Sequence, residues 1–278
     1  MTRISPERLV NSILILITVA VGLSAALPSG ATDRPVVNIA HRVGITDVYP
    51  ENTLAEYRRA MSVGADDIEL DQRSKKDGRL VILHDETLDR TTDGSRLVTE
   101  FTLVELKKLN AGGNEQIPTY EEVLQLVANT GTKLLLDIKN CPLLDKGEIV
   151  RLTEKYKASS DVIFGVRNLD GFAAFRKLNP EIRTLGFITT PFEIEKFADA
   201  GVDIIRLWAW WLFLYPDLMK EARHLQKPVW VTAGDAPRGD LERLISLGVD
   251  GIITDHPDLM TELQSEIKVA ARGPNEQR

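Results

Sequence analysis

Short apolar runs alternate with amphipathic stretches along most of the chain. The runs are rich in Val, Ile and Leu and are bounded by Gly, Asp, Asn or Pro, a pattern typical of buried strands. The expected strands are residues 36–41, 67–71, 80–84, 133–139, 162–166, 184–188, 203–207, 228–231 and 251–254.

Amphipathic segments with a helical period lie between these runs. Several begin with a capping residue or Pro and end close to Gly, as does the segment that begins at Pro191 and precedes Gly201. The expected helices are residues 53–63, 120–129, 146–156, 170–177, 191–200, 216–224, 239–247 and 258–266. Strict alternation of strands and helices indicates a parallel sheet.

A turn signal explains why there is one strand too many for an eightfold barrel. Asp77-Gly78 lies between the second and third apolar runs, where it predicts a β-hairpin. Residues 80–84 then fold back beside residues 67–71, and eight strands and eight helices remain. This count favours a (β/α)8 TIM-type barrel with a hairpin and a small insertion, residues 86–116, after the second strand. A doubly wound open sheet is the alternative, but the chain has no GxGxxG or Walker loop to support nucleotide binding in it.

The first 31 residues differ in pattern from the rest. Arg3 and Arg8 precede a mostly apolar stretch that is followed by small residues, the order of a secretory signal peptide. An uncleaved membrane anchor is the alternative, and cleavage is favoured because residues 13–23 fall short of the roughly 20 that span a bilayer. We therefore expect an extracytoplasmic (secreted or periplasmic) protein. Its expected parts are a signal peptide or anchor at 1–31, a barrel domain at 32–270 and a disordered tail at 271–278.

Composition narrows the classes of partner. The chain has 278 residues, with 34 Lys and Arg against 41 Asp and Glu, so its net charge is −7. This acidic balance argues against nucleic-acid binding, which needs a basic surface. Cys141 is the one cysteine, which excludes an intrachain disulfide and cysteine-rich zinc sites.

Acidic residues gather where the predicted barrel strands end, which is where barrels carry their functional groups. Glu69 and Asp71 are two residues apart on one strand, so they share a face. Asp137 lies at the end of the next barrel strand and can join them. Three carboxylates suit Mg²⁺ or Ca²⁺ better than zinc. The alternative is an ordinary strand with one polar face, since apolar residues alternate with Glu69 and Asp71.

Two histidines and two cations lie at the same strand ends. His41 and His84 each close a predicted strand, and imidazoles beside a metal can supply an acid and a base near neutral pH. Arg42 and Lys139 could bind phosphate oxygens, which makes phosphoryl transfer a candidate reaction. The alternative is that both cations only neutralise the neighbouring acids, which would leave a metal ion little net attraction.

These motifs resemble the glycerophosphodiester phosphodiesterase family over about residues 40–258. The resemblance rests on His41-Arg42, Pro50-Glu51-Asn52-Thr53, residues 64–71, Lys76-Asp77-Gly78, residues 84–92, residues 117–123, Asp137-Ile138-Lys139 and residues 248–257. It implies a (β/α)8 barrel and a divalent cation, usually Ca²⁺ or Mg²⁺, held by Glu69, Asp71 and Asp137. It also implies that His41 and His84 form the acid–base pair.

In the mechanism that the resemblance implies, one histidine deprotonates the neighbouring glycerol hydroxyl, which attacks phosphorus. The other histidine protonates the departing alcohol, and water then opens the cyclic phosphate to give glycerol phosphate. Arg42 and Lys139 would hold charge on the phosphate. Glu51 and Asn52 would brace the first loop, with Glu51 also near the metal.

Three positions depart from the family pattern. Val43 separates His41-Arg42 from Gly44 and could narrow the phosphate pocket. Asp137 stands where the family usually has Glu, which shortens the third acid by one methylene. The segment around Trp230 lacks the usual Asn; Trp230 is a candidate substrate contact, with barrel core as the equal alternative.

An aromatic cluster at residues 208–215 follows a predicted strand and is expected in a loop on the active rim. It could contact a membrane surface, or it could be buried over the barrel mouth, which is slightly favoured. We expect a metal-dependent phosphodiesterase that acts on a small glycerophosphodiester or on a lysophospholipid. The alternatives are a phospholipase-type barrel that acts on intact lipid, and a phospholipid head-group-binding barrel without turnover.

Overall fold

The computed structural model describes residues 35–42, 50–75, 79–139 and 142–272. The predictions for residues 1–31, for Val43 and for residues 273–278 therefore lie outside the described residues.

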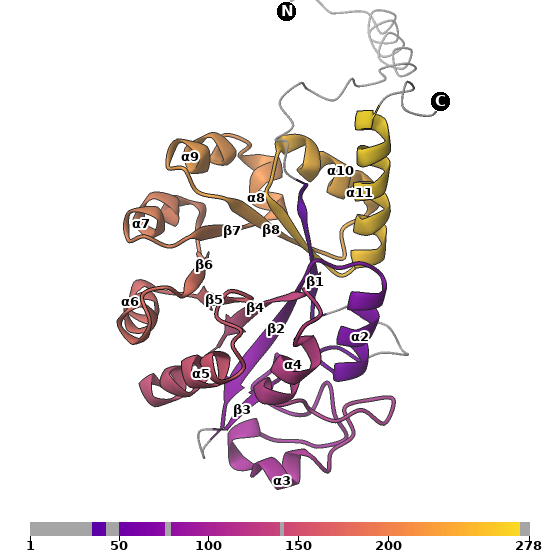
Figure 1. Cartoon of the computed structure of the whole chain (residues 1–278), viewed down its shortest axis with the longest axis vertical. Coiled ribbons are helices and arrows are strands. Elements are labelled where there is room, and N and C mark those ends of the chain that lie inside the picture. The colour runs from indigo at the N-terminus through magenta and orange to yellow at the C-terminus, as the bar shows by residue number, and fades with distance from the viewer. Residues whose placement is uncertain (1–34, 43–49, 76–78, 140–141, 273–278) are drawn as a thin grey trace, which may run out of the picture. The chain divides into compact units, whose positions relative to one another are not determined.

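Eight parallel strands close into a barrel, and one more strand forms the hairpin (Figure 1). The strands are β1 (Val37–His41), β2 (Asp67–Ser74), β3 (Leu80–Ile82), β4 (Lys133–Ile138), β5 (Val162–Val166), β6 (Arg183–Phe187), β7 (Ile204–Trp208), β8 (Val229–Gly234) and β9 (Gly251–Thr254). Strand β1 pairs with both β2 and β9, which closes the sheet and excludes the open-sheet alternative. Strand β3 pairs antiparallel with β2, which confirms the predicted hairpin.

Helices follow the barrel strands and form its outer layer (Figure 1). They are α2 (Leu54–Ser62), α3 (Leu103–Leu106), α4 (Tyr120–Val127), α5 (Leu143–Lys155), α6 (Leu169–Leu178), α7 (Ile194–Asp199), α8 (Ala209–Leu214), α9 (Leu218–His224), α10 (Arg238–Leu247) and α11 (Pro257–Arg272), with 3-10 turns η1 (Val98–Glu100) and η2 (Pro191–Glu193). Helix α11 extends to Arg272, so residues 271 and 272 of the predicted disordered tail are helical. Within the described part of the chain, no helix is both long and apolar enough to cross a membrane.

Alternation along the strands divides the core into two layers. Inward-facing side chains fill the barrel, and they are Ile39, Leu135, Ile163, Leu185, Phe187, Ile204, Trp230 and Ile253. Outward-facing apolar residues pack under the helices in a larger cluster. Successive side chains of a strand point to opposite faces of the sheet, so the acids of β2 point into the barrel together with these core residues.

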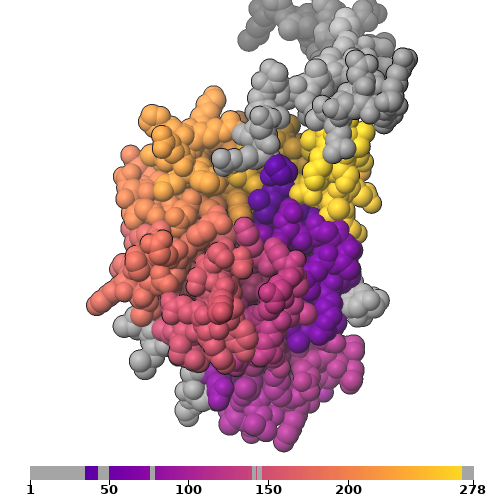
Figure 2. Space-filling view, viewed as in Figure 1, coloured from indigo at the N-terminus to yellow at the C-terminus, as the bar shows by residue number. Residues whose placement is uncertain are grey.

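The insertion after β3 has its own small core. Val81, Leu88, Val98, Leu106 and Ile117 are almost fully buried in it. Thr102 and Glu105 form a capping box, in which each side chain accepts a hydrogen bond from the backbone of the other, and this stabilises the short helix α3. Figure 2 shows the insertion as a magenta lobe beside the barrel. The loop that carries His84 therefore leads from the barrel wall into a separately packed unit.

Gly165 on β5 is required by close packing inside the barrel. A Cβ atom there would lie 2.3 Å from the Phe187 ring and 2.6 Å from the backbone oxygen of Leu136. We expect Gly165→Ala to lower the free energy of unfolding by about 1–3 kcal/mol. In Gly147→Ala, on α5, the new methyl group meets no atom within 4 Å, so this control should raise stability by about 0.5–1 kcal/mol. Urea unfolding of both variants measures the contrast, and equal effects would contradict it.

Candidate active site

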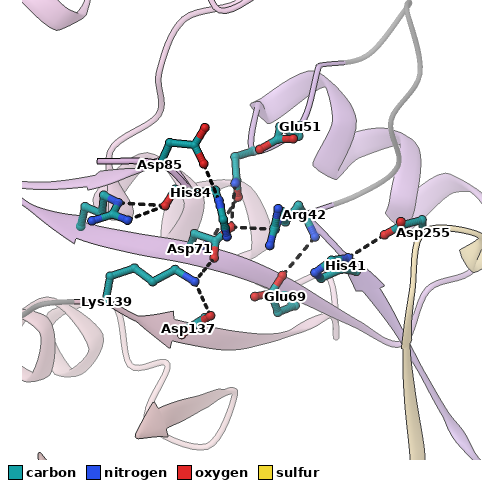
Figure 3. Close-up of polar contacts among 12 residues, drawn as sticks. His41, Arg42, Glu51, Glu69, Asp71, His84, Asp85, Asp137, Lys139 and Asp255 are labelled. Carbon is teal, nitrogen blue, oxygen red and sulfur yellow. Dashed lines mark hydrogen bonds and ion pairs between the residues drawn. The ribbon is translucent and has the colours of Figure 1, made fainter. Parts of the chain in front are cut away.

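Three buried carboxylates converge at the carboxyl ends of β2 and β4 (Figure 3). Asp71 and Asp137 are direct neighbours in the parallel pairing of these strands, and Glu69 lies beside His41 in the pairing of β1 with β2. One oxygen of each of Glu69, Asp71 and Asp137 lies within 4.8 Å of the others. The structure therefore brings the three predicted metal ligands together.

Burial and neighbouring charges move the pKa values of two of these acids in opposite directions. Burial and the charge of Asp71 raise the pKa of Glu69 to about 8. Burial would also raise the pKa of Asp71, but the positive charges of Lys139, Arg42 and His84 outweigh it and the pKa is lowered. The cationic side chains of Lys139 and Arg42 contact Asp71 directly, and this accounts for the opposite directions of the two shifts.

The two predicted phosphate-binding cations lie against the acids. Lys139 Nζ is 2.7 Å from Asp71 Oδ1 and 2.5 Å from Asp137 Oδ2. Arg42 Nε is 3.1 Å from Asp71 Oδ2, and its backbone N–H donates to Glu69 Oε2 at 3.1 Å. Arg42, directly after β1, has a φ of 47°, in the left-handed region.

Arg167 is a third cation that the sequence reasoning missed. Its Nη2 lies 2.8 and 2.6 Å from the two carboxylate oxygens of Asp137. The residue directly follows β5, so its place at a strand's carboxyl end was the available signal. Asp137 therefore has two cationic partners, Lys139 and Arg167, and the short acid is held by contacts on both of its oxygens.

The donor set fits a hard divalent cation. Glu69, Asp71 and Asp137 supply carboxylate oxygens within reach of one another, and Mg²⁺ and Ca²⁺ prefer such ligands. Among the described residues Glu69 has no ion pair with Lys or Arg, so its oxygens are not held by a competing side-chain cation. Lys139, Arg42 and Arg167 offset the charge of the other two acids, which limits the net attraction for an ion.

His41 is oriented by a carboxylate from the last barrel strand. Its Nδ1 lies 2.6 Å from Asp255 Oδ1, directly after β9. Because an ionised carboxylate only accepts, Nδ1–H donates and Nε2 remains for chemistry. Burial disfavours the protonated ring, but the hydrogen bond to Asp255 and the charges of Glu69 and Asp255 outweigh it, so the pKa of His41 is raised.

His84 has a matching arrangement and lies next to Asp71 and Asp85 (Figure 3). Its Nδ1 lies 2.6 Å from Asp85 Oδ1, and Arg73 donates to the His84 backbone oxygen at 2.9 and 2.6 Å. Arg90 Nε donates to Asp85 at 2.6 Å, and its other nitrogens bind both oxygens of Glu51 at 2.7 Å. Arg90 thus links Glu51, shortly before α2, to Asp85 next to His84.

Asn52 links the first loop to the acids. Its side-chain nitrogen donates to Asp71 Oδ2 at 3.0 Å, and its side-chain oxygen accepts from Tyr57 Oη at 2.8 Å. Asn52 has a φ of 57°, a left-handed conformation that Asn tolerates better than most residues. Asn52 therefore connects Asp71 to the fully buried Tyr57 on α2.

Trp230 is not at the site. It is 4% exposed and packs inside the barrel, where it lines a cavity at the amino ends of the strands with Asp67, Lys133 and Asp250. The predicted strand ended at residue 231, which placed Trp230 near a carboxyl end. Strand β8 continues to Gly234, so Trp230 lies near its start and the barrel-core alternative describes its position.

Arg206 is a buried cation across the barrel from β2. It is 4% exposed, and its guanidinium lies 4.9 Å from the Phe187 ring and 4.1 Å from the Trp208 ring. Burial lowers its pKa to about 10, opposed by the negative charges of Asp137 and Glu69. Arg206 thus adds positive charge below the barrel mouth, a role that its position inside a short apolar strand did not suggest.

The aromatic cluster forms a helix where a loop was expected, and it is only half buried. Trp211 and Leu212 on α8 are buried, whereas Trp210 is 56% exposed. Leu214 and Tyr215 are exposed as well. The predicted burial therefore holds for one face of α8, and the other face remains apolar and open.

The His41–Asp255 pair predicts a pH-dependent stability. A raised pKa means that the folded protein binds the His41 proton more tightly, so this stabilisation is present below about pH 6.5 and is lost as pH rises through the raised pKa. We expect Asp255→Asn to destabilise the metal-free protein more at pH 5.5 than at pH 9, measured by urea unfolding in EDTA. Asp235→Asn removes the partner of His256 from an exposed pair and should have little effect. A cost of Asp255→Asn that does not vary with pH would contradict the prediction.

Comparison with known proteins agrees with this geometry. Residues 41–259 match the glycerophosphoryl diester phosphodiesterase family. A glycerophosphodiester phosphodiesterase of Caldanaerobacter subterraneus subsp. tengcongensis is 35% identical over 236 residues, which cover 81% of this chain and 96% of that protein.

Solved structures show the same fold. A phosphodiesterase of Oleispira antarctica, in complex with the product sn-glycerol-3-phosphate, has a TM-score of 0.74 at 27% identity, over 84% of this chain and 97% of that one. A glycerophosphodiester phosphodiesterase of Agrobacterium tumefaciens has a TM-score of 0.71 at 26% identity, over 82% of this chain and 99% of that one. With the family match spanning the barrel from His41 onward, this chain belongs to the glycerophosphoryl diester phosphodiesterase family.

Proposed function

We propose that this protein hydrolyses glycerophosphodiesters to glycerol phosphate and an alcohol. The observation that carries the proposal is a pair of histidines next to one buried acidic trio, His41 beside Glu69 and His84 beside Asp71 (Figure 3). His41 and His84 each have a carboxylate within 2.6 Å of Nδ1, so both rings are held in one tautomer with Nε2 available.

The two rings can perform complementary proton transfers. One histidine takes the proton of the glycerol hydroxyl next to the phosphate, and that oxygen forms a bond to phosphorus. The bond from phosphorus to the alcohol oxygen breaks, and the other histidine protonates the departing alcohol. In a second step the roles reverse: water is deprotonated, attacks the cyclic phosphate, and the ring oxygen regains a proton.

Positive side chains supply the electrostatic part of the mechanism. Arg42 and Lys139 lie against Asp71, where they can contact a phosphate bound beside the acids and stabilise the charge of the transition state. A divalent cation, Ca²⁺ or Mg²⁺, would be held by Glu69, Asp71 and Asp137 and would supply Lewis-acid stabilisation of phosphate oxygens.

Substitution of each histidine tests the acid–base roles. We expect His41→Ala and His84→Ala each to lower kcat for glycerophosphocholine by about 10²–10⁴-fold. His224→Ala, an exposed residue at the end of α9, serves as the matched control and should retain activity. Near-normal rates in both active-site variants would overturn the roles, and no turnover by the wild type would favour a head-group-binding protein.

The metal proposal is tested by removal and by binding. EDTA should abolish hydrolysis, and added Ca²⁺ or Mg²⁺ should restore it and raise the Tm of the metal-free protein. Asp137→Asn should weaken this rise in Tm, because one charged ligand is lost. A chain whose activity and Tm do not change with either ion would contradict the assignment.

We also propose that the protein acts outside the cytoplasm, because residues 1–31 have the pattern of a secretory signal peptide. Cell fractionation tests this location.

A lipid-surface contact next to the barrel mouth is a second proposal. Phe192 in the loop after β6 is 88% exposed, and Trp210, Leu214 and Tyr215 after β7 form an exposed apolar set of the types that favour membrane interfaces.

Exchange of one exposed aromatic residue tests the lipid contact. Trp210→Ala should lower kcat/KM for lysophosphatidylcholine in micelles several-fold and leave kcat/KM for soluble glycerophosphocholine unchanged, because only the micelle would contact α8. Leu178→Ala, at an exposed leucine on α6, is the control. Equal rates of the two variants on micelles would overturn the proposal.

A further inference from the structure

We propose that Arg206 binds an oxygen of the substrate phosphate from the wall of the barrel opposite β2. The inference rests on the proposed phosphodiesterase function and adds a substrate-binding residue to that site. It starts from a buried guanidinium on β7 whose Nε and Nη1 atoms have no hydrogen-bond partner.

The side chain of Arg206 points into the barrel. Ile204 on the same strand belongs to the inner core, and a period of two places Arg206 on the same face, one step nearer to the carboxyl end. In the closed order of strands, three strands separate β7 from β2 in either direction, so Arg206 faces the strand that carries Glu69 and Asp71. The negative charges of Asp137 and Glu69 oppose the lowering of the Arg206 pKa by burial, so the acidic trio is within electrostatic reach.

The charge of Arg206 is not neutralised within the protein. Among the described residues its guanidinium has no ion pair, and the residue is only 4% exposed. Arg42, Lys139 and Arg167, in contrast, each contact an acid of the trio. An unpaired buried charge is costly, so the protein gains free energy when a ligand brings the opposite charge to Arg206.

Two aromatic rings hold the guanidinium in place. The Cζ atom of Arg206 lies 4.9 Å from the centre of the Phe187 ring and 4.1 Å from the centre of the Trp208 ring. Phe187 is the direct neighbour of Arg206 in the pairing of β6 with β7, and Trp208 ends β7. An aromatic ring attracts a cation without neutralising it. The cation is therefore positioned before a ligand arrives, and its N–H groups remain available to an anion.

The phosphate is the substrate group that meets both walls of the barrel. A phosphodiester shares one negative charge between two non-bridging oxygens. One of these oxygens can lie on the side of Arg42 and Lys139, while the other points toward Arg206 on β7. Arginine donates charge-assisted hydrogen bonds to phosphate oxygens, and these bonds strengthen as charge builds up on the oxygens in the transition state. We therefore expect Arg206 to contribute to phosphate affinity and to kcat/KM.

Calorimetry with glycerol 3-phosphate tests the contact without turnover. Arg206→Met keeps an unbranched side chain and removes the charge and the donors. With Ca²⁺ or Mg²⁺ present, we expect it to weaken binding of glycerol 3-phosphate roughly tenfold or more, because a charge-assisted contact is lost. Arg206→Lys should recover part of the affinity, because it restores the charge without the planar fork. The matched control is Arg243→Met on α10, which removes an exposed guanidinium 4.3 Å from the Phe213 ring and should leave the affinity unchanged.

The Tm of the ligand-free protein separates phosphate binding from a structural role. Because Arg206 is buried without a partner, Arg206→Met should not lower this Tm, whereas loss of a cation that only stabilises the fold would lower it. Unchanged affinity for glycerol 3-phosphate, or a lowered Tm together with a loss of affinity that Arg206→Lys does not recover, would overturn the inference and leave the phosphodiesterase function standing. Binding that depends on Arg206 in a wild type that hydrolyses no glycerophosphodiester would support the phosphate contact and overturn the proposed function.

Discussion

The burial of three carboxylates in one barrel mouth is the constraint on which the rest of the site depends. Ionised acids this close together and this far from water repel one another, so the fold must supply positive charge or a proton. Lys139 and Arg42 contact Asp71, Arg167 contacts Asp137, and Glu69 has a pKa of about 8. The cations that can meet a substrate phosphate are the same ones that make the acidic site stable without it.

Two different parts of the fold orient the two histidine rings. Each ring has its Nδ1 fixed by an aspartate, but the two aspartates come from distant parts of the chain. Asp255 follows the last barrel strand, and Asp85 is the neighbour of His84 itself. Closure of the barrel between β1 and β9 therefore positions the partner of His41, whereas the insertion positions the partner of His84.

The sequence was sufficient for the barrel, the hairpin and the acidic trio, because these depend on local period and on strand ends. Glu69 and Asp71 share a face by the period of two, and the Asp77-Gly78 signal correctly separated β3 from the barrel count. Partners across the barrel could not be predicted in the same way. Arg167 contacts Asp137 because β5 pairs with β4, and Arg206 lies inside the barrel on β7. The strand predicted around Trp230 ends three residues before β8 does.

The orientation of His84 depends on the folded insertion. Arg90 contacts both Glu51 and Asp85, and Asp85 in turn contacts the His84 ring. The insertion has a small core of its own, so it can open in a local event that leaves the eight barrel strands paired. Such an opening would release Arg90, free the Asp85 carboxylate and let the imidazole rotate. The enzyme would then lose its chemistry at a temperature or denaturant concentration below that of global unfolding, so that inactivation and melting are separate events in one molecule.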